Sequence, residues 1–160
     1  MATQNIVQYL ETSQYFADQR DGSTTSIGPE AMNRRQIETF IAGGVIAAND
    51  LVALDFSATG DGTIGITVVK ADSGSVDSIA GLGFALSSAA AAGETVDVTI
   101  AGIHVSANVA GAVAKGDRLS ISAVAGQADT YVNSDTVPVL AYALEDDTAN
   151  VASVFVIKQM

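Results

Sequence analysis

A chain of 160 residues is long enough to bury one hydrophobic core and too short for two large domains. Its apolar residues are mostly small or β-branched and include no tryptophan, a composition that favours strands and tight turns over a helical bundle. The net charge of −11 opposes binding to nucleic acid. The absence of cysteine excludes a disulfide framework, a thiolate nucleophile and a cysteine-based zinc site.

Residues 1–35 differ in composition from the rest of the chain and are predicted to form an arm rather than a domain. Glutamine, asparagine, serine, threonine and charged residues dominate the segment, and Gly28-Pro29 closes it. Its apolar residues lie early and fit one or two turns of amphipathic helix, an extended strand with anchoring side chains, or a disordered tail. The start of the chain lacks the basic residues and apolar run of a signal peptide, so we expect a soluble protein that acts without secretion.

From residue 36 onward, apolar residues alternate with polar or small ones. The alternation is clearest at 36–40, 64–68 and 94–100, and it is typical of half-buried strands. Turn residues separate these segments, and such short, regularly spaced strands indicate a sandwich or a small barrel. We therefore predict an all-β domain, a small β-barrel, over residues 36–160, in which the alanine-rich stretch 87–92 forms a loop.

An internal repeat indicates that this barrel is built from two related halves. The first pair of similar segments shares a strand approach, an Asn-Asp or Gly-Asp turn and a second strand, and two further pairs follow at one common offset. The pairs are 45–54 with 112–121, 79–86 with 137–144, and 96–98 with 154–156. Small side chains in both halves allow the strands to approach closely.

Two motifs resemble parts of functional sites. Residues 60–65 have the Gly-x-Gly-x-x-Gly spacing of a phosphate-binding loop, but a strand pattern follows where such a loop needs a helix, so a hairpin turn is predicted. His104 is the only histidine, and alternation with its two apolar neighbours predicts an outward, solvent-facing position. Ser106 and Asp97 are candidates for a catalytic dyad with it, but the sequence does not supply the geometry that a dyad needs.

The acidic residues give no strong signal for a metal. Residues 145–147 are all acidic and are predicted to form a turn between strands rather than a cation site. Residues 55–60 lack the carboxylates that a calcium loop needs at its third and fifth positions. We expect no catalytic residue, no cofactor and no metal, and hence no enzyme.

The order of these segments resembles the decoration proteins, also called capsid cement proteins, of tailed-phage heads. The residues that carry the resemblance follow the Asn-Asp and Gly-Asp turns: Gly-Phe-Ala-Leu at 83–86, Gly-Glu-Thr-Val-Asp-Val at 93–98, Ala-Gly-Ile at 101–103, Ala-Tyr-Ala-Leu-Glu at 141–145 and Val-Phe-Val-Ile at 154–157. The resemblance covers residues 36–158. It implies a small barrel of the β-tulip or β-clip type, often trimeric, with an amino-terminal segment that engages the capsid lattice.

The resemblance implies a capsid decoration protein that binds the outer surface of a phage head and stabilises the shell by bridging neighbouring capsid subunits. The expected partners are the major capsid protein and further copies of this chain, as a trimer or another small ring, and neither nucleic acid nor a membrane. Residues 36–160 carry −10 of the net charge and would be repelled by packed DNA, so we expect them on the outer face of the virion, after assembly in the host cytoplasm. The alternatives are a virion fibre or receptor-binding module, and a trimeric β-clip nucleotide hydrolase.

The arm is expected to bind the capsid through apolar anchors and basic residues. These residues are Tyr9, Leu10, Tyr15, Phe16, Arg34 and Arg35. The first 35 residues depart from the compact members of the decoration family, and their mode of binding is left open by the sequence.

Overall fold

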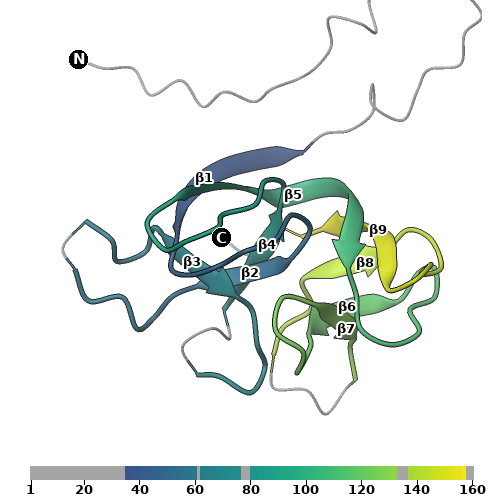
Figure 1. Cartoon of the computed structure of the whole chain (residues 1–160). Helices are drawn as coiled ribbons and strands as arrows, with labels where there is room; N and C mark the ends of the chain where they lie inside the picture. The colour runs from purple at the N-terminus through teal and green to yellow at the C-terminus, as the bar shows by residue number, and fades with distance from the viewer. Residues whose placement is uncertain (1–34, 61, 77–79, 133–136, 158–160) are drawn as a thin grey trace, which may run out of the picture.

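The computed structural model describes residues 35–60, 62–76, 80–132 and 137–157. Over these residues the chain is all β, as predicted (Figure 1). The strands are β1 Gln36–Ala42, β2 Leu51–Leu54, β3 Thr67–Lys70, β4 Gly81–Ala85, β5 Thr95–Asn108, β6 Arg118–Ile121, β7 Ala128–Thr130, β8 Ala141–Ala143 and β9 Val151–Val156.

The first five strands close into a barrel. Their order is β1-β3-β2-β4-β5, and β5 returns to pair with β1. β1 runs parallel to β3, and the other neighbours are antiparallel. Inward-facing apolar side chains fill this barrel, among them Phe40, Val52, Val68, Leu82, Val96 and Val98. Closure pairs strands that would otherwise be edges of the sheet.

Strand β5 is long enough to serve a second sheet. Residues 95–101 pair with β1 and β4, whereas residues 102–108 pair with β9. The second sheet continues in the order β9-β8-β6-β7, and a parallel bridge between Val109 and Ala128 joins β7 to the chain just after β5. Figure 1 shows β1 to β4 on one side of β5 and β6 to β9 on the other.

The two groups of strands have the same topology, which confirms the prediction of two related halves. In each half the first strand lies antiparallel to the last strand and contacts the third in parallel: β1 with β5 and β3, and β5 with β9 and the first residue of β7. The second strand lies between the third and fourth in both halves. Strand β5 is therefore the last strand of the first half and the first strand of the second.

The turn before the second strand is the same in both halves. Asp50 accepts a hydrogen bond from the amide of Ala47 at 2.8 Å, and Asp117 accepts one from the amide of Ala114 at 2.9 Å. The preceding residue has a left-handed backbone, with φ of 72° at Asn49 and 92° at Gly116. Asparagine and glycine tolerate this conformation, which explains why the two turns read Asn-Asp and Gly-Asp.

The strand pairing corrects one part of the predicted repeat. Ala85 pairs with Val98 and its counterpart Ala143 pairs with Val154, so Val98 corresponds to Val154. The predicted repeat instead matched Val96 with Val154, so it was shifted by two residues along β5. A slip of two keeps every side chain on the same face of a strand, so the alternation pattern alone does not detect it.

One predicted strand begins later than expected. The segment 64–68 alternates correctly, but β3 starts only at Thr67. Gly62 and Gly65 have left-handed φ angles of 91° and 78°, and the amide of Thr63 bonds to the carbonyl oxygen of Gly60, so a turn occupies the alternating residues before Thr67. A strand follows the Gly-x-Gly-x-x-Gly spacing, as predicted, and not a helix.

Candidate functional site

The predicted capsid-binding arm lies almost wholly outside the described residues. Tyr9, Leu10, Tyr15, Phe16 and Arg34 fall within residues 1–34, and their roles stay predictions. Arg35 is described, and its positive charge helps to lower the pKa of His104. Arg35 precedes β1, whose first residue pairs with Ala101, next to the point at which β5 passes from the first sheet to the second.

A cluster of polar side chains, here called the junction cluster, lies where the two halves meet. Its members are Asn49, Asp50, Lys70, Thr99, His104 and Asn108. Asp50 forms an ion pair with Lys70 at 2.9 Å and accepts a hydrogen bond from the Asn108 side chain at 2.9 Å. The backbone amide of Asn108 also donates to the carbonyl oxygen of Asn49. These bonds tie the turn of the first half to the long strand β5.

His104 belongs to this cluster, so the predicted outward position of His104 is wrong. The ring is 1% exposed, its Nε2 lies 3.1 Å from Oδ1 of Asn49, and its Nδ1 lies 3.3 Å from Oγ1 of Thr99. It also stacks on Phe84 with ring centroids 5.4 Å apart. The apolar neighbours Ile103 and Val105 occupy the outward face instead, because the inner face of the second half receives the histidine.

Burial first, and the positive charge of Arg35 second, lower the pKa of His104 from 6.5 to about 4. The folded state thus favours the neutral ring, while the unfolded chain takes up a proton below pH 6.5. The stability that His104 contributes is therefore present above pH 6.5 and lost as the pH falls towards 4. When the pH falls from 7.5 to 5, protonation of His104 in the unfolded chain is expected to lower the free energy of unfolding by about 2 kcal/mol.

Urea unfolding of the native chain and of His104→Gln at both pH values measures this contribution. The two chains differ only at residue 104, so the difference between their pH dependences isolates the contribution of the histidine. Equal pH dependence in the two chains would show that folding does not lower the pKa of His104.

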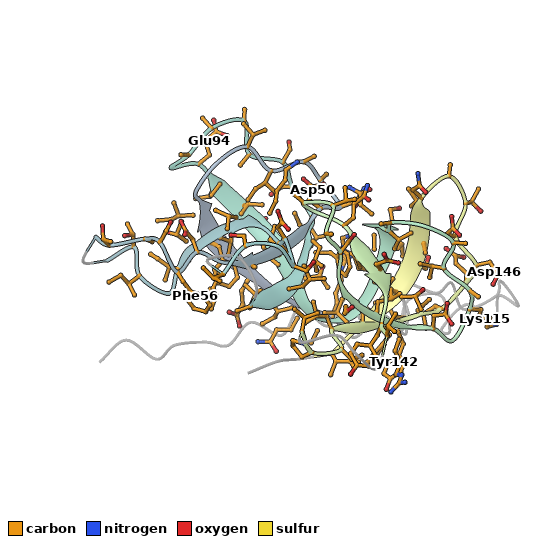
Figure 2. The ribbon with its side chains drawn as sticks, turned by 90° about the horizontal axis from the view of Figure 1, so that it is seen from below. Asp50, Phe56, Glu94, Lys115, Tyr142 and Asp146 are labelled. Atoms are coloured by element: carbon orange, nitrogen blue, oxygen red, sulfur yellow. The ribbon has the colours of Figure 1, made fainter. Side chains whose placement is uncertain are left out.

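The acidic residues 145–147 form a turn between β8 and β9, as predicted. Each carboxylate accepts a backbone amide: Glu145 that of Ser153, Asp146 that of Lys115 and Asp147 that of Val113. The bonds from Ser153 lower the pKa of Glu145. Figure 2 shows Lys115 and Asp146 together at one end of the molecule. These carboxylates hold loops together, and in the described part of the chain no group of acidic or histidine side chains is placed to bind a metal ion.

The outer face of the second half carries a row of large side chains, here called the Tyr142 face. Its members are Ile103, Phe155, Tyr142 and Arg118. Strand register places Ile103 beside Phe155, Phe155 beside Tyr142, and Tyr142 beside Arg118. Phe155 and Tyr142 are 45% and 43% exposed, and the guanidinium of Arg118 lies 5.2 Å from the centre of the Tyr131 ring. Aromatic residues and arginine are enriched in protein interfaces.

A second exposed apolar surface lies on the loop between β2 and β3, here called the Phe56 loop. Residues 55–66 form this loop, which is twice the length of its counterpart 122–127 in the second half. Phe56, Ile64 and Ile66 lie on it and are 57%, 63% and 43% exposed. Figure 2 shows Phe56 and Tyr142 in different parts of the molecule. The second half forms with the shorter loop, so the fold alone does not require these apolar residues.

Sequence reasoning did not identify either surface. A signal for the Tyr142 face was present, because Tyr142 and Phe155 each stand between two small or β-branched residues of a short strand. When such flanking residues face inward, the aromatic residue faces outward. The Phe56 loop had no comparable signal, since Ile64 and Ile66 fit the alternation of a strand.

Comparisons with known proteins do not assign the chain to a family. No protein-family model matches it, and no curated protein matches it. Among solved structures, the head fibre gp8.5 N base of bacteriophage phi29 aligns with a TM-score of 0.49 and 18% identity, covering 77% of this chain and 94% of that one. A likeness at this level does not establish a shared function. Among the described residues, no helix is long and apolar enough to cross a membrane.

Proposed function

We propose that this chain is a capsid decoration protein that binds the outer surface of a phage head and stabilises the shell by bridging neighbouring capsid subunits. The observation that carries the proposal is the pair of separate exposed apolar surfaces, the Tyr142 face and the Phe56 loop, on an acidic body. Exposed apolar groups of this kind mark sites of protein interaction. Two such surfaces on one chain support association with further copies, and such an assembly brings several capsid-binding arms together to bridge neighbouring subunits.

The charge of the body supports a position on the outside of the shell. Residues 36–160 hold fourteen acidic and four basic residues. Packed DNA inside a head would repel this surface, and counterions screen such repulsion only beyond about 8 Å at physiological salt. The outer wall of a capsid does not face the packed DNA.

The arm is proposed to provide the contact with the major capsid protein. Each aromatic or aliphatic anchor that it buries contributes about 1.5 to 3 kcal/mol, and several arms held in one oligomer bind with a raised effective concentration. Arg34 and Arg35 place positive charge next to the acidic body, where they can meet carboxylates of the lattice. Self-association of the chain, as a trimer or another small ring, belongs to the same proposal.

The test is the amount of chain bound to purified particles. Mass spectrometry should find it in hundreds of copies, whereas a fibre or an enzyme would be present in few or none. Serine at Tyr9, Leu10, Tyr15 and Phe16 should reduce occupancy at least tenfold, since even one lost anchor removes about 1.5 kcal/mol.

The matched control places serine at Gln4, Asn5, Gln8 and Gln14, which leaves the anchors in place and should not change occupancy. Circular dichroism checks that both variants keep the β fold. Full occupancy of the anchor variant would show that the body alone binds the shell.

A further inference from the structure

The junction between the two halves buries a defined row of side chains on the outer face of the first half. Strand register places Leu51 beside Phe84, Phe84 beside Thr99, and Thr99 beside Ile37. Leu51, Phe84 and Thr99 are completely buried. Leu51 and Phe84 belong to the same apolar core as the interior of the second half. The outer face of the first half is thus the seat on which the second half packs.

The Tyr142 face is the counterpart of this seat. The two halves pair their strands in the same way, so residues at equivalent positions can be matched. Leu51 corresponds to Arg118, Phe84 to Tyr142, Thr99 to Phe155 and Ile37 to Ile103. Among the described residues no further half covers the corresponding row of the second half, and Tyr142 and Phe155 are exposed. The described part of the chain therefore exposes, on its second half, a copy of its own internal packing surface.

The part of the second half that reaches the seat includes the loop between β6 and β7. The amide of Leu51 donates to the carbonyl oxygen of Gly126 at 2.7 Å, and the amide of Ser73 donates to that of Ser122 at 3.0 Å. A Cβ atom on Gly126 would lie within 3.1 Å of the Asp50 carboxylate. Contact through this loop is therefore close.

The counterpart of that loop in the first half is the Phe56 loop. Both loops connect the second and third strands of their half. In the first half the loop is longer, and its apolar residues face solvent. The chain thus exposes both partners of one contact, a seat on its second half and a loop on its first half.

We propose that a second copy of this chain occupies the Tyr142 face, packing its Phe56 loop there as the second half packs on the first. The contact is head-to-tail, and successive contacts of this kind close into a ring of copies when the rotation between them allows closure. The charges of the two surfaces are complementary in part, since Arg118 lies on the Tyr142 face and Asp55 is the first residue of the Phe56 loop. The inference rests on the self-association in the proposed function and names the surfaces that carry it.

Sedimentation velocity and light scattering of the full chain, free of capsid, test the ring. The native chain is expected to form a small closed oligomer. Tyr142→Glu disrupts the Tyr142 face and Phe56→Glu disrupts the Phe56 loop. Each variant should therefore raise the protein concentration at which half of the chains are assembled by about thirtyfold or more, the scale of an interface hot spot.

A mixture of the two variants gives the sharpest readout. The Phe56→Glu chain keeps an intact Tyr142 face, and the Tyr142→Glu chain keeps an intact Phe56 loop. One chain of each kind can therefore form a single native contact, but the two cannot close a ring. The expected product is a heterodimer that appears only on mixing. A symmetric contact between two Tyr142 faces would instead let Phe56→Glu associate as the native chain does, and that result would overturn the proposal.

Val45→Glu is the matched control, because Val45 is 65% exposed and belongs to neither surface. It adds the same charge and should leave the oligomer intact. A native chain that stays monomeric at high concentration would also overturn the ring. If the ring forms but the chain is absent from purified particles, only the proposed decoration role fails.

Discussion

Replacing Asp50 with alanine is expected to lower the free energy of unfolding by about 3 kcal/mol, because it removes the centre of the junction cluster. The Asp50 carboxylate is nearly buried and bonds to the Lys70 ammonium, the Asn108 side chain and the Ala47 amide. Alanine would leave all three donors without this acceptor. The Asn108 side chain belongs to β5, the strand that joins the halves, and water cannot fully replace its acceptor there.

The repeat supplies the control for this experiment. Asp117 holds the equivalent turn in the second half, but there it bonds to the Ala114 amide and, at 3.4 Å, to the Thr130 hydroxyl. Asp117→Ala should therefore cost about 1 kcal/mol, the loss of a turn bond. Urea unfolding at pH 7 measures both variants. Equal losses would mean that Asp50 acts only as a turn residue and that the junction adds nothing.

Replacing Gly83 with alanine should lower the free energy of unfolding by about 3 kcal/mol through a steric clash. A Cβ atom on Gly83 would lie 2.0 Å from the carbonyl oxygen of Thr99 and 2.9 Å from its carbonyl carbon. Both atoms belong to the backbone of β5 and cannot rotate away. The substitution would force β4 and β5 apart, and those strands belong to the closed first barrel.

Gly44→Ala is the comparison, since a Cβ atom there would meet no atom within 4 Å. Its φ angle is not left-handed, so the substitution should leave stability within about 0.5 kcal/mol of the native value. Thermal and urea unfolding of the two variants separate the clash from any general effect of removing a glycine. A native-like Gly83→Ala would show that the two strands can separate at little cost.

Several features of the fold follow from local sequence. Alternation in residues 36–40 and 94–100 predicted strands where β1 and β5 lie, because a half-buried strand has only one period. The Asn-Asp and Gly-Asp turns marked the start of the second strand in each half, since the left-handed residue and the aspartate cap act within a few residues. The acidic turn at residues 145–147 was likewise predicted from the sequence.

The position of His104 and the two exposed surfaces depended on tertiary structure. Alternation tells that His104 and Ile103 face opposite ways, but not which face a second layer covers. Strand β5 serves two halves, so its inward face in residues 102–108 is set by β9 and by Phe84. The repeat of 79–86 with 137–144 already made Phe84 and Tyr142 equivalent in the sequence, but only the tertiary structure showed that Phe84 is buried and Tyr142 exposed.

The sequence by itself determined the all-β class, the duplication, the turns and the acidic charge, because each depends on residue type or on spacing within one half. Tertiary structure alone decided how the halves meet. The ion pair of the buried Asp50 with Lys70, the buried His104 and the exposed Tyr142 face all arise from packing between segments far apart in the chain. Such packing depends on the register and facing of paired strands, and a sequence with a two-residue period is compatible with more than one register.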